Sequence, residues 1–133
     1  MKKPIRVGII GVGNCFAGLI QGIEFYRKNP RKKVIGLIHR KIGPYDFKDI
    51  NFVSAFDVGA NKIGQPLNKA VFAEPNLVNW IKLPKNKTVV REAPILDGVG
   101  IYVANKIKPL KNPTSPKKLR EKIIKEIKKT NTE

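Results

Sequence analysis

The strongest constraint on the fold is an apolar run closed by glycines near the amino terminus. Residues 5–10 read IRVGII, and Gly11-Val12-Gly13 follows directly. A short run of β-forming residues without polar alternation is typical of a strand that is buried on both faces. Residues 15–28 then carry apolar side chains at helical spacing, and we expect Asn14 to cap this helix. The pattern predicts a strand, a glycine turn and a helix in immediate succession.

The alternation of strands and helices continues along the chain. A second buried strand is predicted over residues 51–58, NFVSAFDV, with Asp57 at its end. Residues 59–73 then predict a broken helix whose second half begins at Pro66. A third strand is expected over 88–95 and a short helix over 101–107. The inward stripe of the broken helix is expected to be Leu67, Ala70 and Val71.

This order of elements predicts an α/β fold, the first half of a Rossmann-like, doubly wound parallel sheet with three strands and flanking helices. A chain of 133 residues can bury one modest core. We divide it into a partial dinucleotide-binding domain over 1–110, with an insertion at 29–50, and a tail over 111–133. The tail reads as a polar linker and a basic amphipathic helix, with Ser115 as N-cap, Pro116 at the first helical position and a stripe of Leu119, Ile123, Ile124 and Ile127.

Positive charge dominates the composition. Lys and Arg number 27 against 10 Asp and Glu, which gives a net charge of +17. Six of these basic residues are Arg, although recognition of phosphates and bases favours Arg over Lys. We therefore interpret the excess as a solvated lysine-rich surface and do not expect nucleic acid as a partner. A non-catalytic basic module that binds nucleic acid or another polyanion is the alternative interpretation.

Several single residues favour structural roles. Cys15 has no second cysteine to pair with and is expected to be a small packing residue, and Trp80 a packing anchor. His39 lacks neighbouring metal ligands, and Asp97 fits a turn, so we assign no metal site and no catalytic residue. Glycines interrupt the apolar stretch that a signal peptide needs, and no apolar run approaches the ~18 residues of a membrane span. We expect a soluble, cytoplasmic protein.

The glycine turn itself suggests a chemistry. Residues 11–16, GVGNCF, form an incomplete GxGxxG, in which Phe16 stands where a small residue is usual. The two glycines permit a tight turn and the close approach of a diphosphate to the helix amides. Asp57 ends the second strand, where an acid accepts hydrogen bonds from the ribose of NAD, although it follows Gly11 by 46 residues rather than ~20. Dinucleotide binding is one interpretation, and a plain glycine turn with a capping or ion-paired aspartate is the other.

Three longer stretches carry a resemblance to a known family. They read IRVGIIGVGNCFAGLIQGIEFY, GLIHRKIGPYDFKDINFVSAFDVGANKIGQPLNKAVFAEPN and APILDGVG. In this order they resemble the archaeal and actinobacterial type of myo-inositol-1-phosphate synthase, also called inositol-3-phosphate synthase. The most specific pieces are GVGNC, the insertion and AFDV, because other Rossmann proteins share only the glycines.

The resemblance implies the NAD-dependent isomerisation of D-glucose 6-phosphate to 1D-myo-inositol 3-phosphate, a step of inositol and phospholipid biosynthesis. It also implies cofactor contacts from Asp57 and from the turn residues Gly11, Val12, Gly13, Asn14 and Cys15. Two positions depart from the family pattern, because Phe16 replaces a small residue and Gly59 replaces a frequent second acid.

The resemblance also implies that catalysis needs more than this chain. The family's catalytic lysines and acids lie in a later domain, and a dinucleotide straddles the crevice beside a fourth strand. We therefore expect an amino-terminal piece of a split or truncated synthase, completed by a carboxy-terminal synthase chain or by a homo-oligomer. A regulatory or vestigial fragment that pairs with a full-length synthase is a further alternative.

Overall fold

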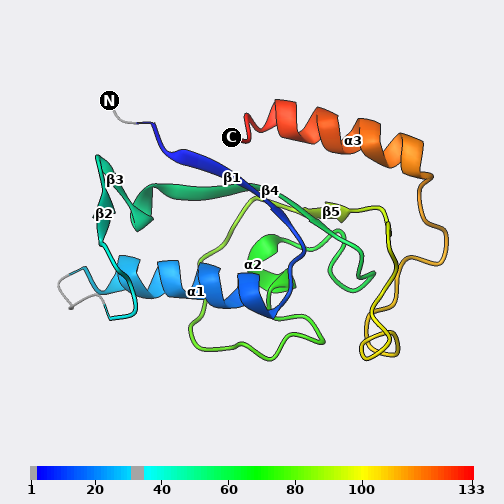
Figure 1. The fold of residues 1–133 in the computed structure, drawn as a ribbon, viewed down its shortest axis with the longest axis horizontal. Helices are drawn as coiled ribbons and strands as arrows, with labels where there is room; N and C mark the ends of the chain where they lie inside the picture. Colours follow the sequence, from blue (N-terminus) through cyan, green and yellow to red (C-terminus); the bar gives the residue numbers. More distant parts are fainter. Residues whose placement is uncertain (1–2, 31–34) are drawn as a thin grey trace.

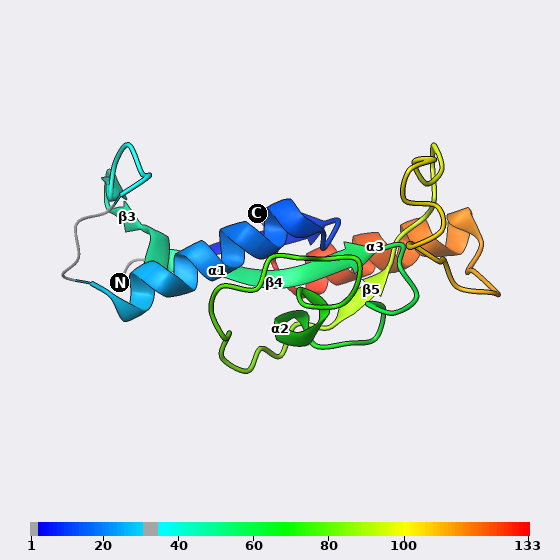
Figure 2. The same ribbon diagram turned by 90° about the horizontal axis from the view of Figure 1, so that it is seen from below.

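The computed structural model describes residues 3–30 and 35–133, and within them a three-stranded parallel sheet forms the centre (Figure 1). The strands are β1 (Ile5–Ile10), β4 (Ile50–Asp57) and β5 (Val90–Glu92), in the order β1-β4-β5. Helices α1 (Asn14–Lys28) and α2 (Leu67–Ala70) lie on one face, and α3 (Pro116–Lys129) lies on the other (Figures 1 and 2). The predicted class, a partial Rossmann-like α/β fold, is confirmed.

The two long strands match the predicted apolar runs. β1 pairs with β4 in parallel, from Ile5 opposite Ile50 to Ile10 opposite Phe56. The third strand, predicted over 88–95, is shorter, because the residues before it pair with another segment. Val89 forms an antiparallel bridge with Pro66, and Pro94, which cannot donate a ladder hydrogen bond, follows closely after its end.

The main core lies between the sheet and the face that carries α1 and α2. Phe16 and Ile20 from α1 meet Ala55 of β4 there. The predicted stripe of the broken helix is confirmed, since Leu67, Ala70 and Val71 are completely buried. Regular helix is limited to Leu67–Ala70, and residues 60–64 form turns. This core fixes the position of the first strand-to-helix turn.

The opposite face is covered by α3 and the residues that follow it. Pro116 occupies the first turn as predicted, and Leu119 is buried, while Ile124 and Ile127 remain exposed. Gly8 allows the segment after α3 to approach β1 closely, because a Cβ at this position would lie 2.8 Å from Cγ2 of Thr132. The amide of Glu133 donates to the carbonyl of Arg6 over 2.8 Å, so the end of the described chain lies beside β1.

The predicted insertion contains a small hairpin. Strands β2 (Lys41–Ile42) and β3 (Tyr45–Asp46) pair antiparallel around Gly43, whose φ of +55° suits glycine. A 3₁₀-helix, η1 (Phe47–Asp49), follows, and Asp46 caps it. Residues 31–34 of the insertion fall outside the described part of the chain.

Four local predictions were wrong. Asn14 is the first residue of α1 rather than its cap, because Gly13 occupies the N-cap position. Trp80 is 73% exposed, with its ring beside Gly18 of α1, since the surrounding 74–87 segment is an irregular surface loop. Cys15 is exposed, because it lies on the outer side of α1. Residues 101–106 form turns instead of a helix, with Ile101 and Tyr102 exposed, because no element covers an apolar face there.

Within the described ranges, none of the helices is both long enough and apolar enough to cross a lipid bilayer.

Candidate functional site

The glycine turn between β1 and α1 is tight and open. Gly11 has a φ of +88°, a conformation that favours glycine, and its amide donates to the carbonyl of Phe56 over 2.8 Å. Gly13 is the N-cap of α1. No atom lies within 4 Å of a Cβ built on Gly11 or on Gly13. The free amides at the amino end of a 15-residue helix therefore border open space, as an anion site requires.

Phe16 does not block this turn. Its side chain is 7% exposed and points into the core, where its ring meets that of Phe52 edge-to-face at a centroid distance of 5.0 Å. Because the aromatic side chain packs between α1 and β4, it does not fill the open space beside the glycine turn.

Asp57 links the two parts of the predicted site. Its Oδ2 accepts a hydrogen bond of 2.6 Å from the amide of Val12, and its Oδ1 accepts one of 2.8 Å from the amide of Gly59. Each carboxylate oxygen has the capacity to accept a second hydrogen bond, and Asp57 is 9% exposed. A Cβ at Gly59 would lie 3.2 Å from Asp57 Oδ1, so the glycine relieves crowding around the carboxylate.

Two residues that the sequence analysis missed complete this network. Lys62 is 4% exposed, and its Nζ donates to the carbonyl of Val12 over 2.7 Å and to Oδ1 of Asn76 over 3.0 Å. Burial lowers the pKa of Lys62 below its ordinary value, and the attraction of Asp57 opposes that lowering. A lysine five residues after the strand-end acid was the available signal, but nothing in its spacing marks it as buried.

The remaining predicted residues have separate roles. The side chain of Asn14 accepts hydrogen bonds from the amides of Leu77 and Val78, at 2.7 and 3.3 Å, and so fixes the 77–78 segment against α1. Cys15 is exposed on the first turn of α1. His39 and Asp97 are both exposed in other loops, and the structure does not bring them into this network.

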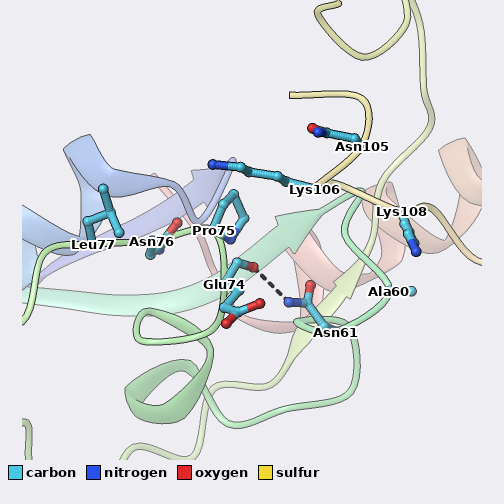
Figure 3. Close-up of a pocket in the computed structure, with 9 residues that line it drawn as sticks. All are labelled: Ala60, Asn61, Glu74, Pro75, Asn76, Leu77, Asn105, Lys106 and Lys108. Atoms are coloured by element: carbon cyan, nitrogen blue, oxygen red, sulfur yellow. Dashed lines mark hydrogen bonds between the residues drawn. The ribbon is translucent and has the colours of Figure 1, made fainter. Parts of the chain in front are cut away.

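A cavity of about 690 Å³ lies next to the turn (Figure 3). Its walls include Asn76 and Leu77, which also bond to the turn network. The opposite rim carries Lys106 and Lys108, and the amide of Ala60 donates to the carbonyl of Lys108 over 2.8 Å, which ties the rim to the loop after β4. The amides at the amino end of a helix and an acid therefore lie beside this cavity at the carboxyl ends of β1 and β4, where open α/β sheets bind ligands, although neither the turn nor Asp57 lines the cavity itself.

Sequence comparison identifies known proteins that are similar to this chain. Over 105 residues, 77% of this chain, it is 46% identical to the inositol-3-phosphate synthase of Mycolicibacterium smegmatis. The chain is homologous to the amino-terminal part of inositol-3-phosphate synthase. The matched region represents 29% of the length of the mycobacterial synthase. No protein-family model matches the chain.

Two solved structures share the fold of this chain. The crystal structure of Ari2 superimposes with a TM-score of 0.74 and 31% identity, over 98% of this chain and 36% of Ari2. A myo-inositol-1-phosphate synthase-related protein from Thermotoga maritima gives a TM-score of 0.64 and 22% identity, over 97% of this chain and 32% of that protein. The similarity covers α3 as well as the sheet.

Proposed function

We propose that this chain is the NAD-binding amino-terminal portion of an inositol-3-phosphate synthase, which converts D-glucose 6-phosphate to 1D-myo-inositol 3-phosphate. The observation that carries the proposal is the open glycine turn, joined through Val12 to the strand-end acid Asp57. The turn at Gly11–Asn14 and the exposed Cys15 would hold the diphosphate, and Asp57 would accept the adenosine ribose hydroxyls. An acid at that position favours NAD over NADP.

The residues of this chain fit binding and orientation rather than bond breaking. When bound, NAD supplies a hydride acceptor that returns the hydride later in a redox-neutral isomerisation. The amides of the turn would neutralise the diphosphate, and Asp57 would fix the adenosine end. The adjacent cavity offers room beside them. The groups that act on the sugar phosphate would come from the part of the synthase that the matched 29% leaves out.

We further propose that a second polypeptide, the carboxy-terminal part of a synthase, completes the site in the cytoplasm. The support comes from β1, whose one partner strand among the described residues is β4. Ile10 is 83% exposed at its end, although apolar residues at this point of a doubly wound sheet are normally covered by a fourth strand and its helix. A homo-oligomer is the competing partner.

Titration of the purified chain with NAD, followed by calorimetry and thermal unfolding, tests the cofactor proposal. A ligand that binds the folded state raises the melting temperature, and we expect NAD to do so more than NADP. Gly13→Ala is the matched variant, because its Cβ enters open space and should block the diphosphate without disturbing packing. No stabilisation by millimolar NAD would refute binding by this chain. Salt-sensitive RNA binding without any NAD effect would favour the polyanion-binding alternative instead.

Mixing the chain with a carboxy-terminal synthase polypeptide, and assaying inositol phosphate formation from glucose 6-phosphate, tests the second proposal. We expect association and activity in the mixture and none in either chain alone. Absence of both would exclude a split enzyme. Light scattering on the isolated chain distinguishes the homo-oligomer.

A further inference from the structure

We propose that Lys62 is a positioning residue for the dinucleotide, holding the carbonyl of Val12 away from the diphosphate so that the amides of the glycine turn stay available to it. The inference rests on the proposed function and deepens it.

The geometry around Val12 carries this inference. Its carbonyl accepts two hydrogen bonds, from Nζ of Lys62 at 2.7 Å and from Nδ2 of Asn76 at 2.9 Å. The same Asn76 amide also donates to Val71 over 3.0 Å, which ties it to the core. The amide of Val12 is held by Asp57 at 2.6 Å. The peptide groups on both sides of Val12 are therefore fixed by side chains from three separate segments.

Such fixation matters because the turn is otherwise soft. Gly11 and Gly13 flank Val12, and neither carries a side chain that could restrict the backbone. If the peptide between Val12 and Gly13 rotated, it would turn a carbonyl oxygen instead of an amide toward a bound diphosphate. Holding donors in place before the ligand arrives lowers the cost of ordering them on binding.

The charge of Lys62 adds to this effect. Asp57 places a negative charge close to the position proposed for an anionic diphosphate. Lys62 is 4% exposed and is attracted by Asp57, so its ammonium offsets that charge without occupying the ligand position. An exposed lysine could not do this, because water would screen it.

A purely structural lysine would behave differently, and the test uses that difference. Lys62→Met removes the donor while keeping most of the buried chain length, and Lys69→Met, on an exposed position of α2, is the matched control. In Lys62→Met we expect NAD affinity measured by calorimetry to fall ~10-fold or more, the effect of losing a hydrogen bond from a charged donor. The control should bind as the wild type does. A structural role would lower the melting temperature and leave the affinity of the folded protein unchanged, which would overturn the proposal.

Amide hydrogen exchange without NAD gives a second, independent measurement. Lys62→Met should speed exchange at the hydrogen-bonded turn amides of Gly11 and Val12 and leave Ala55 and Phe56 of β4 unchanged. Unchanged exchange at the turn would overturn the inference even if NAD binding were lost. If wild-type protein fails to bind NAD, the proposed function fails, while the exchange result still decides whether Lys62 orders the turn.

Asn76→Ala keeps the proposal falsifiable should Lys62→Met fail to fold. It removes the other donor to the Val12 carbonyl from a half-buried position. We expect a smaller loss of NAD affinity and faster exchange at the same amides. Wild-type behaviour in both measurements would count against the inference.

Discussion

The two faces of the sheet are held by different kinds of interaction. On the face of α1 and α2, a continuous apolar core includes Phe16, Ile20 and Leu67. On the face of α3, Leu119 is the buried residue of the helix, and polar contacts predominate. Arg6 Nε donates a hydrogen bond of 2.8 Å to the carbonyl of Thr130, and the hydroxyls of Ser54 and Thr132 share a hydrogen bond of 3.0 Å. Arg91 and Glu126 form an ion pair on the same face.

This difference gives the two faces different roles, because one stabilises the fold and the other positions a segment of the chain against the sheet. Burial of apolar area is the main source of folding free energy, so the α1 face should dominate the stability of the chain. The α3 face relies on directional hydrogen bonds that add little net energy each but fix where the chain lies. The candidate site lies on the α1 face, because the glycine turn joins β1 to α1. We therefore expect the rigidity of the site to depend on the packing of that core.

The largest expected effect comes from truncating one apolar side chain on each face, which compares how much each face contributes to the free energy of unfolding. Phe16→Ala should cost ~3–5 kcal/mol of unfolding free energy, since it empties the contact with Phe52. Leu119→Ala should cost about 2 kcal/mol, the low end for such truncations, because its helix neighbours are solvated and the site can relax. Urea denaturation of both variants provides the measurement. Equal losses would break the proposed contrast between the faces.

A second test concerns the close approach on the α3 face. Gly8→Ala should lower the unfolding free energy by ~1–3 kcal/mol, because its Cβ would lie 2.7 Å from Ser54 Oγ and 2.8 Å from Thr132 Cγ2. Adding Thr132→Ser removes the methyl group while retaining the hydroxyl, and should restore part of the loss. Thermal unfolding of the single and double variants measures both the loss of stability and its partial recovery. No rescue would mean that the carboxy-terminal segment does not press on the sheet.

The fold was largely predictable because its signals are local and strong. The apolar runs at 5–10 and 51–58 correctly predict strands, although β1 is half-buried rather than buried on both faces, and Pro116 marks the start of α3. The predictions that were wrong concern features that depend on tertiary contacts. Exposure of Trp80 and the turns at 101–106 depend on which surfaces find a covering partner, and a single segment carries no information about that.

The two glycines of the turn should differ in what their substitution damages. Gly11→Ala should destabilise by ~1–2 kcal/mol, because alanine is strained at a φ of +88°. Gly13→Ala should leave stability nearly unchanged, since φ there is −91° and the added Cβ meets open space. Denaturation curves for the pair measure the stability difference. A large loss in Gly13→Ala would show that the turn is closed rather than open.

The candidate site was predictable only in part. The glycines and Asp57 are visible because a motif prescribes their chemistry. Lys62 and Asn76 were missed because their function depends on burial and on one shared acceptor, the carbonyl of Val12. The direction of Phe16 was not predictable for a related reason: sequence gives the size of a side chain, but where it points depends on the position of Phe52.

The smallest expected effect is that of the ion pair on the α3 face. Arg91 Nε and Glu126 Oε1 lie 2.9 Å apart, but Arg91 is exposed, so water and salt screen the attraction. A double-mutant cycle with Arg91→Ala and Glu126→Ala should give a coupling of ~0.2–1 kcal/mol that shrinks with added salt. The pair should therefore orient α3 against β5 without contributing much stability. A coupling well above this range that persisted in salt would place the pair in a dry environment, and the α3 face would then need to be regarded as a second core.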